Sequence, residues 1–82
     1  MTGAAVDPAA ETMRLLAARA PGATICPSEV ARALAGGADW RGEMARVHAA
    51  VDALVAAGRV RLSWKGEVKG VRAGPYRIGR AE

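Results

Sequence analysis

Five basic residues in the last third of the chain offer the first chemistry that the sequence suggests. They are Arg59, Arg61, Lys65, Lys69 and Arg77. Arg59 and Arg61 flank an apolar residue, so both side chains should leave the same side of a strand, where Arg77 of a returning strand can join them. Each base could neutralise one phosphate of a nucleic acid and release a counterion. The alternative is a solvated strand face whose charges prevent aggregation through the sheet edge.

The segment 39–58 is predicted to form a long amphipathic helix. Its apolar residues follow the spacing of one helix face and are Trp40, Met44, Val47, Val51, Leu54 and Val55. Asp39 suits the N-cap, and Gly58 suits the left-handed position after the last turn. Arg41 and Arg46 are the exposed candidates for contacts to DNA, and Arg46 alone could read guanine. Because few other base-reading side chains are present, we expect backbone binding with weak sequence specificity.

The opposite face of this helix is small and nearly uncharged. It consists of Gly42, Ala45, Arg46, Ala49, Ala53 and Ala56. Such a face permits close approach of a second helix, a second copy of the chain or a nucleic-acid backbone. A homodimer through this Ala-rich face is therefore one hypothesis. The alternative is that alanine, a strong helix former, stands wherever nothing else is required.

Cys26 is the one residue with reactive potential, because a helix N-terminus favours the thiolate. It suggests a thiol-based redox sensor, although a single small cysteine is more often part of a core. As the only cysteine, it excludes an internal disulfide and favours a reducing cytoplasm. His48 has no second histidine or cysteine cluster beside it in the sequence, so we expect no metal site. We also expect no cofactor and no enzymatic activity, because no nucleophile–base set is recognisable.

The order of elements along the chain predicts a fold. Residues 1–6 read as a disordered tail, and residues 7–80 as one domain. A helix opens at Asp7-Pro8, a strand of two or three residues includes Thr24-Ile25, and a second helix starts at Cys26. After the long helix come a strand at 59–65, a polar loop at 65–70 and a return strand at 74–79. This order predicts an α+β winged helix-turn-helix domain, with three helices and a small antiparallel β-wing.

Several segments carry a resemblance to a known family. The runs ICPSEVARALA, DWR, GRV, WKG and GPYRI are similar to those of a small bacterial family catalogued as a domain of unknown function. The similarity extends from about Thr12 to Arg80 and is strongest in the segments 26–31 and 74–75. Members of this family resemble winged helix-turn-helix proteins. The resemblance implies that fold but no activity, so it supplies no catalytic residue.

Composition and charge restrict the class of protein. The chain has 82 residues and a net charge of +4, and from Asp39 onward it has nine bases against five acids. This excess favours an anionic partner, with double-stranded DNA as the first hypothesis. The second hypothesis is a protein-interaction or dimerisation module without a nucleic-acid role. No apolar run is long enough to span a membrane and no signal peptide is recognisable, so we expect a soluble cytoplasmic protein.

Overall fold

The computed structural model of the chain describes residues 7–37, 39–70 and 72–81. The predicted disordered tail at 1–6 lies outside the described residues. In chain order, the elements are helix α1 (Pro8–Ala17), strand β1 (Thr24–Ile25), helix α2 (Pro27–Ala35), 3₁₀-helix η1 (Trp40–Glu43), helix α3 (Met44–Ala56), and strands β2 (Val60–Trp64), β3 (Glu67–Lys69) and β4 (Arg77–Arg80). Three α-helices and an antiparallel sheet form the predicted α+β fold, which is compatible with a winged helix.

Local capping explains where the helices begin and end. The Asp7 carboxylate accepts a hydrogen bond from the backbone N–H of Ala9, and Pro8 takes the first helical position. At α2 the Glu29 carboxylate accepts from the backbone N–H of Cys26 at 2.9 Å, as the sequence predicts. Gly58 follows α3 with φ +73°, a left-handed conformation that glycine adopts without strain.

The predicted long helix begins differently from the expectation. Asp39 does cap it, accepting from the backbone N–H of Arg41 at 3.1 Å, but the residues after it form η1 rather than an α-helical turn. The backbone N–H of Met44 bonds back to the carbonyl of Arg41, the tighter 3₁₀ pattern. Gly42 lies within this turn and weakens the preference for a regular α-helix there. The α-helix itself therefore starts at Met44.

The sheet contains a strand that the sequence prediction missed. Its strand order is β1-β4-β2-β3, and all neighbours are antiparallel. The segment 65–70 was predicted to be a loop, which is wrong for β3: Trp64 pairs with Glu67, and Ser63 with Val68. Lys65 and Gly66 both have positive φ, so two residues are enough to reverse the chain. The predicted antiparallel pairing between the strand at 59–65 and the return strand is confirmed as β2 with β4. The return strand was predicted at 74–79, but β4 begins only at Arg77.

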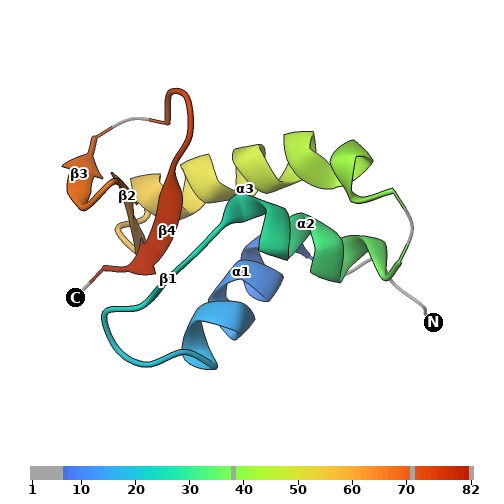
Figure 1. Cartoon of the computed structure of the whole chain (residues 1–82), viewed down its shortest axis with the longest axis horizontal. Helices are drawn as coiled ribbons and strands as arrows, with labels where there is room; N and C mark the ends of the chain where they lie inside the picture. The colour runs from blue at the N-terminus through green and yellow to red at the C-terminus, as the bar shows by residue number, and fades with distance from the viewer. Residues whose placement is uncertain (1–6, 38, 71, 82) are drawn as a thin grey trace.

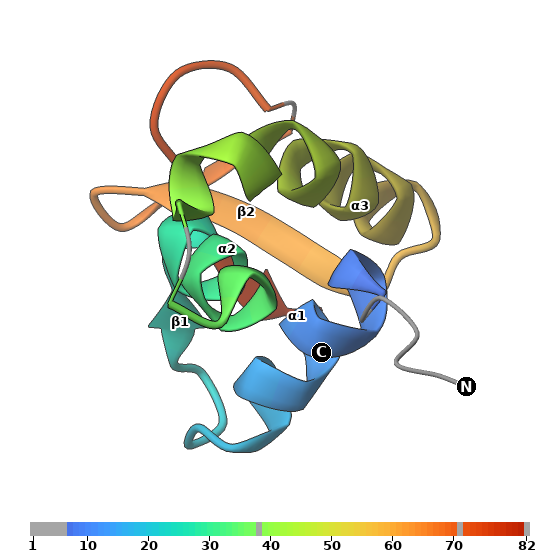
Figure 2. The same cartoon turned by 90° about the vertical axis from the view of Figure 1, so that its right-hand side faces the viewer.

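The three α-helices cover one face of the sheet. Figure 1 shows the strands at the left end of the molecule, with α3 leading directly into β2. Figure 2 shows β2 passing behind the group of helices. Between these layers lies the core, whose buried hydrophobic residues are Leu16, Ile25, Val30, Ala31, Val47, Val51, Leu54, Val60, Leu62, Tyr76 and Ile78. Among the described residues, no helix is long and apolar enough to cross a membrane.

Candidate nucleic-acid interface

Every acidic side chain of the described helices is paired with an arginine. The ion pairs are Glu11–Arg14, Glu29–Arg19, Glu43–Arg46 and Asp52–Arg72. Arg46, the residue predicted to read guanine, has its Nη1 atom 2.6 Å from Oε1 of Glu43. This pairing cancels much of the positive charge on the exposed side of α3. The unpaired positive charge of the chain therefore lies mainly outside α3.

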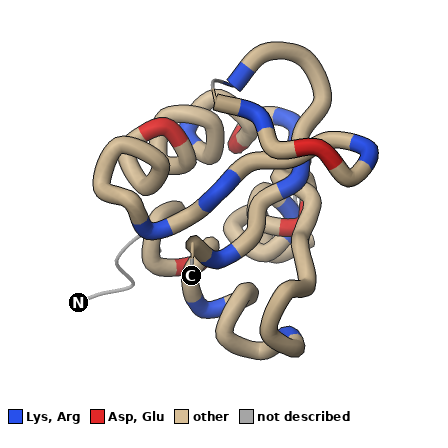
Figure 3. Tube along the Cα trace, turned by 90° about the vertical axis from the view of Figure 1, so that its left-hand side faces the viewer, with Lys and Arg blue, Asp and Glu red and all other residues tan. Residues whose placement is uncertain are grey.

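The outer face of the sheet carries two of the predicted phosphate contacts. Arg61 is opposite Gly79 and Ser63 is opposite Arg77, so these four residues share the face that the helices leave open. Figure 3 views the molecule from this end and shows Lys and Arg positions along the strands. The structure thus brings Arg61 and Arg77 to one surface, as the alternation in the sequence predicts.

Arg77 is fixed on this surface by a threonine from the neighbouring strand. Its Nε atom donates to Oγ1 of Thr24 at 2.8 Å, and its Nη2 atom donates to the carbonyl of Thr24 at 3.0 Å. Two of its five N–H groups are used in these bonds, and the described residues supply no acidic partner for the others. The Arg77 side chain is therefore half-buried and fixed by its bonds to Thr24, unlike a freely moving surface arginine.

Arg59 does not join this group as closely as its sequence spacing suggests. It lies just before β2 and lines a hollow of about 390 Å³ between the start of α1 and the end of α3. Asp7 and Leu54 line the same hollow. By contrast, Arg61 lines a hollow on the outer face of the sheet. The predicted basic cluster is thus divided between two neighbouring surfaces.

The two lysines of the β2–β3 hairpin have different surroundings. Lys65 is exposed at the turn between β2 and β3, where an anionic partner could reach it. The Lys69 ammonium group instead donates to the backbone carbonyl oxygens of Ala73 and Pro75, the latter at 3.2 Å. The expectation that Lys69 serves as a phosphate contact has less support, because its donors hold the following loop. Trp64 and Val68 are the large hydrophobic residues exposed on this hairpin.

Arg41 lies at the other end of the long helix and stacks on an aromatic ring. Its guanidinium carbon is 4.6 Å from the centroid of the Trp40 ring, and that of Arg32 is 4.9 Å from the same centroid. Two cations therefore share one indole, an arrangement that holds both side chains by cation–π attraction. Arg32 was not a predicted site residue, because it belongs to α2 and no sequence spacing connects it to Trp40.

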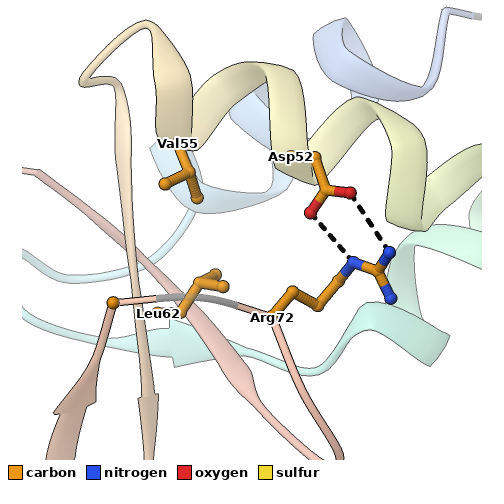
Figure 4. A pocket seen from close by; sticks show the side chains of 5 residues that line it. Asp52, Val55, Leu62 and Arg72 are labelled. Atoms are coloured by element: carbon orange, nitrogen blue, oxygen red, sulfur yellow. Dashed lines mark hydrogen bonds and ion pairs between the residues drawn. The ribbon is translucent and has the colours of Figure 1, made fainter.

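A contact between α3 and the segment before β4 was also missed. The Arg72 guanidinium donates two hydrogen bonds to the Asp52 carboxylate, at 2.9 and 3.1 Å, and these bonds lower the pKa of Asp52. Figure 4 shows this pair beside Val55 and Leu62 in an open pocket of about 300 Å³. Twenty residues separate the partners in sequence, so no local pattern could have revealed the pair.

The remaining candidates have ordinary surroundings. Cys26 is half-buried, and the hydroxyl of Ser28 donates a hydrogen bond to its Sγ atom at 3.2 Å. The Nδ1 atom of His48 lies next to the hydroxyl of Tyr76. Within the described ranges, His, Cys, Asp and Glu side chains do not gather in any group of three that could hold a metal ion. Neither Cys26 nor His48 is thus part of a recognisable reactive centre in the described structure.

Comparison with known proteins identifies a family whose function is unknown. The model of a family described as "Protein of unknown function (DUF3253)" matches residues 5–81. No curated protein matches the sequence.

Proposed function

The chain belongs to this family of unknown function, and we propose that it is a small winged helix module that binds double-stranded DNA through phosphate contacts, without enzymatic activity. One observation carries the proposal: Arg61 and Arg77 share the open face of the sheet, and no acidic residue forms a described ion pair with either of them. Lys65 extends the positive surface to the tip of the hairpin. Clustered cations that are not engaged in ion pairs attract a polyanion and release its counterions.

The proposed binding is weak in sequence specificity. The exposed side of α3 consists mainly of Ala together with charged side chains already in ion pairs, Arg46 with Glu43 and Asp52 with Arg72. Such a surface offers few donors or acceptors to base edges in a major groove. Phosphate contacts set affinity and orientation but carry no direct sequence information. We therefore assign the main contacts to the sheet and hairpin rather than to α3.

The test is the affinity for random duplex DNA, measured by fluorescence anisotropy over a series of salt concentrations. If Arg59, Arg61, Lys65 and Arg77 each contact one phosphate, the logarithm of affinity should fall with that of salt at a slope of about −3 to −4. Duplexes of unrelated sequence should give similar affinities. If no duplex binds even at low salt, the proposal is wrong and an interaction module is the better description.

Self-association is a second candidate function, supported by the exposed face of α3. The Ala-rich face is exposed in the single chain, and its residues are Gly42 of η1 and Ala45, Arg46, Ala49, Ala53 and Ala56 of α3. Two such helices can approach closely, and a small domain gains stability from the extra burial. Analytical ultracentrifugation of the wild type and of Ala49→Glu tests this, because a charge on each copy would oppose the contact. A wild type that is monomeric at high micromolar concentration would exclude the dimer.

A further inference from the structure

The outer face of the sheet has a hollow whose floor is a glycine in the central part of the sheet. The hollow measures about 190 Å³ and lies against Gly79 of β4, with Thr24 on the β1 side and Arg61 and Ser63 on the β2 side. β4 is hydrogen-bonded on both sides, so Gly79 is not an edge residue. A glycine inside a strand often marks a place where a ligand or another backbone comes close.

Gly79 keeps the hollow open. A Cβ atom at this position would lie 3.3 Å from Cγ2 of Thr24, tighter than ordinary van der Waals contact. Its backbone φ is not in the left-handed region, so conformation alone does not require glycine there. The missing side chain thus leaves room at the surface between two neighbouring strands.

The chemistry around the hollow suits a phosphate group. Arg61, Ser63 and Arg80 line it, and no Asp or Glu is among its described lining residues. Arg77 does not itself line the hollow, but it precedes Gly79 by two residues on the same face, and its guanidinium is bonded to Thr24, which does line it. A guanidinium presents several N–H groups in a planar fork that matches phosphate oxygens.

We propose that this hollow is a phosphate subsite, in which one backbone phosphate of a nucleic acid lies over Gly79 and is bound by Arg61, Ser63 and Arg77. The proposal rests on the proposed DNA-binding function and gives it a location. Thr24 acts as a positioning residue, because it fixes Arg77 without itself needing to contact the phosphate. Arg80 adds positive charge at the rim, although one of its N–H groups points to the carbonyl of Arg19 at 3.4 Å.

The first experiment uses pyrophosphate as the probe and follows backbone amide shifts of the whole chain by NMR. Saturable shifts should be confined to residues 22–24, 61–63 and 77–80. Arg61→Gln should weaken pyrophosphate binding about tenfold or more, the effect of one charged hydrogen bond. Arg41→Gln removes the same charge at η1, at the far end of the molecule in Figure 1, and should leave this binding unchanged. Shifts spread evenly over all basic residues would overturn the subsite.

A second pair of variants separates filling of the hollow from loss of charge or of folding. Gly79→Ala keeps the net charge and should weaken pyrophosphate binding, whereas Gly42→Ala, which meets no atom within 4 Å, should not. Adding Thr24→Ser to Gly79→Ala removes the crowded methyl group but keeps the hydroxyl that Arg77 uses. The double variant should regain thermal stability, because the methyl group that the new Cβ atom crowds is gone. If Gly79→Ala binds like the wild type, the subsite is wrong.

Duplex DNA distinguishes failure of the subsite from failure of the function. Pyrophosphate binding at Gly79 without any duplex binding would retain a phosphate site and reject the DNA-binding module. Duplex binding that Gly79→Ala leaves unchanged would retain the module and reject the subsite.

Discussion

The Nδ1 atom of His48 lies 2.7 Å from the hydroxyl oxygen of Tyr76, which joins α3 to the residue just before β4. Tyr76 is buried, and the two ring centroids are 5.7 Å apart. Burial lowers the pKa of His48, the charge of Arg72 lowers it further, and Asp52 opposes the change. The folded protein therefore favours the neutral imidazole at this contact.

The first prediction is that stability falls as the pH drops through the ordinary pKa of histidine. The unfolded chain binds a proton at His48 near 6.5, whereas the folded chain binds it only at lower pH. The contribution of His48 to the free energy of unfolding is therefore complete above pH 6.5, and it is lost as the pH falls below that value. His48 is the only histidine, so an NMR titration of its ring reports this group alone. A midpoint at or above 6.5 would contradict the prediction, and His48→Gln should lack the acid step.

A second prediction concerns the alkaline range. Burial raises the pKa of Tyr76 from 10.0 to about 12. The unfolded chain loses this proton first, so the contribution of Tyr76 is complete below pH 10 and disappears as the pH rises towards 12. The absorbance of the phenolate, measured with urea unfolding over this range, tests the effect on the chain's only tyrosine. Tyr76→Phe should abolish the alkaline step and cost about 0.5–1.5 kcal/mol at neutral pH, from the lost hydrogen bond to His48.

The Asp52–Arg72 pair should order a loop more than it stabilises the fold. Both side chains are partly exposed, and water and salt screen an exposed ion pair, so it contributes little to stability. Asp52→Asn should therefore change the melting temperature little, while amide hydrogen exchange in the segment 72–76 becomes faster. Glu67→Gln removes an equal charge from β3 and is the matched control. Unchanged exchange in Asp52→Asn would show that other contacts hold this segment.

Leu54→Ala should be strongly destabilising. Leu54 is a buried member of the core at the end of α3, and truncation of such a leucine costs about 2–5 kcal/mol. That loss is a large part of the stability of a domain this small. A thermal melt followed by circular dichroism measures it. Ala53→Gly, an exposed change on the same helix, should cost about 1 kcal/mol. A Leu54→Ala melt equal to that of the wild type would contradict the core assignment.

Charge reversal should affect DNA binding according to position on the surface. Arg61→Glu should reduce the affinity for random duplex DNA, for all sequences alike. It should also reduce the magnitude of the salt slope by about 0.9 or more, the amount that corresponds to one lost phosphate contact. Arg46→Glu, the matched reversal on α3, should change affinity less, because Arg46 lies in an ion pair with Glu43. Fluorescence anisotropy at several salt concentrations compares the two. An equal loss in both variants would indicate that α3, not the sheet, supplies the phosphate contacts.

The sequence was sufficient for most of the local structure. Asp7 and Asp39 cap the first and the long helix, Thr24-Ile25 forms a strand, and Gly58 adopts the left-handed conformation, all as predicted. Each of these features depends on residues within one turn or one strand. The apolar periods likewise predicted which faces are buried, including Val47, Val51 and Leu54 on α3. The strand β3 was missed because it is only three residues long and two of them are charged. Its turn also includes Lys65 in a left-handed conformation, which the residue type does not predict.

Contacts between distant residues were decided only by the tertiary structure. The alternation around Val60 indicated that Arg61 leaves the core, but not that Arg59 would line a different hollow. Thr24 and Arg77 meet across 53 residues, His48 and Tyr76 across 28, and Asp52 and Arg72 across 20. Their pairing follows from strand order and helix packing, since burial of the whole core sets which surfaces face each other. Local propensity determined the elements of this protein, and only the packing of those elements determined which charged side chains are paired and which remain open to a partner.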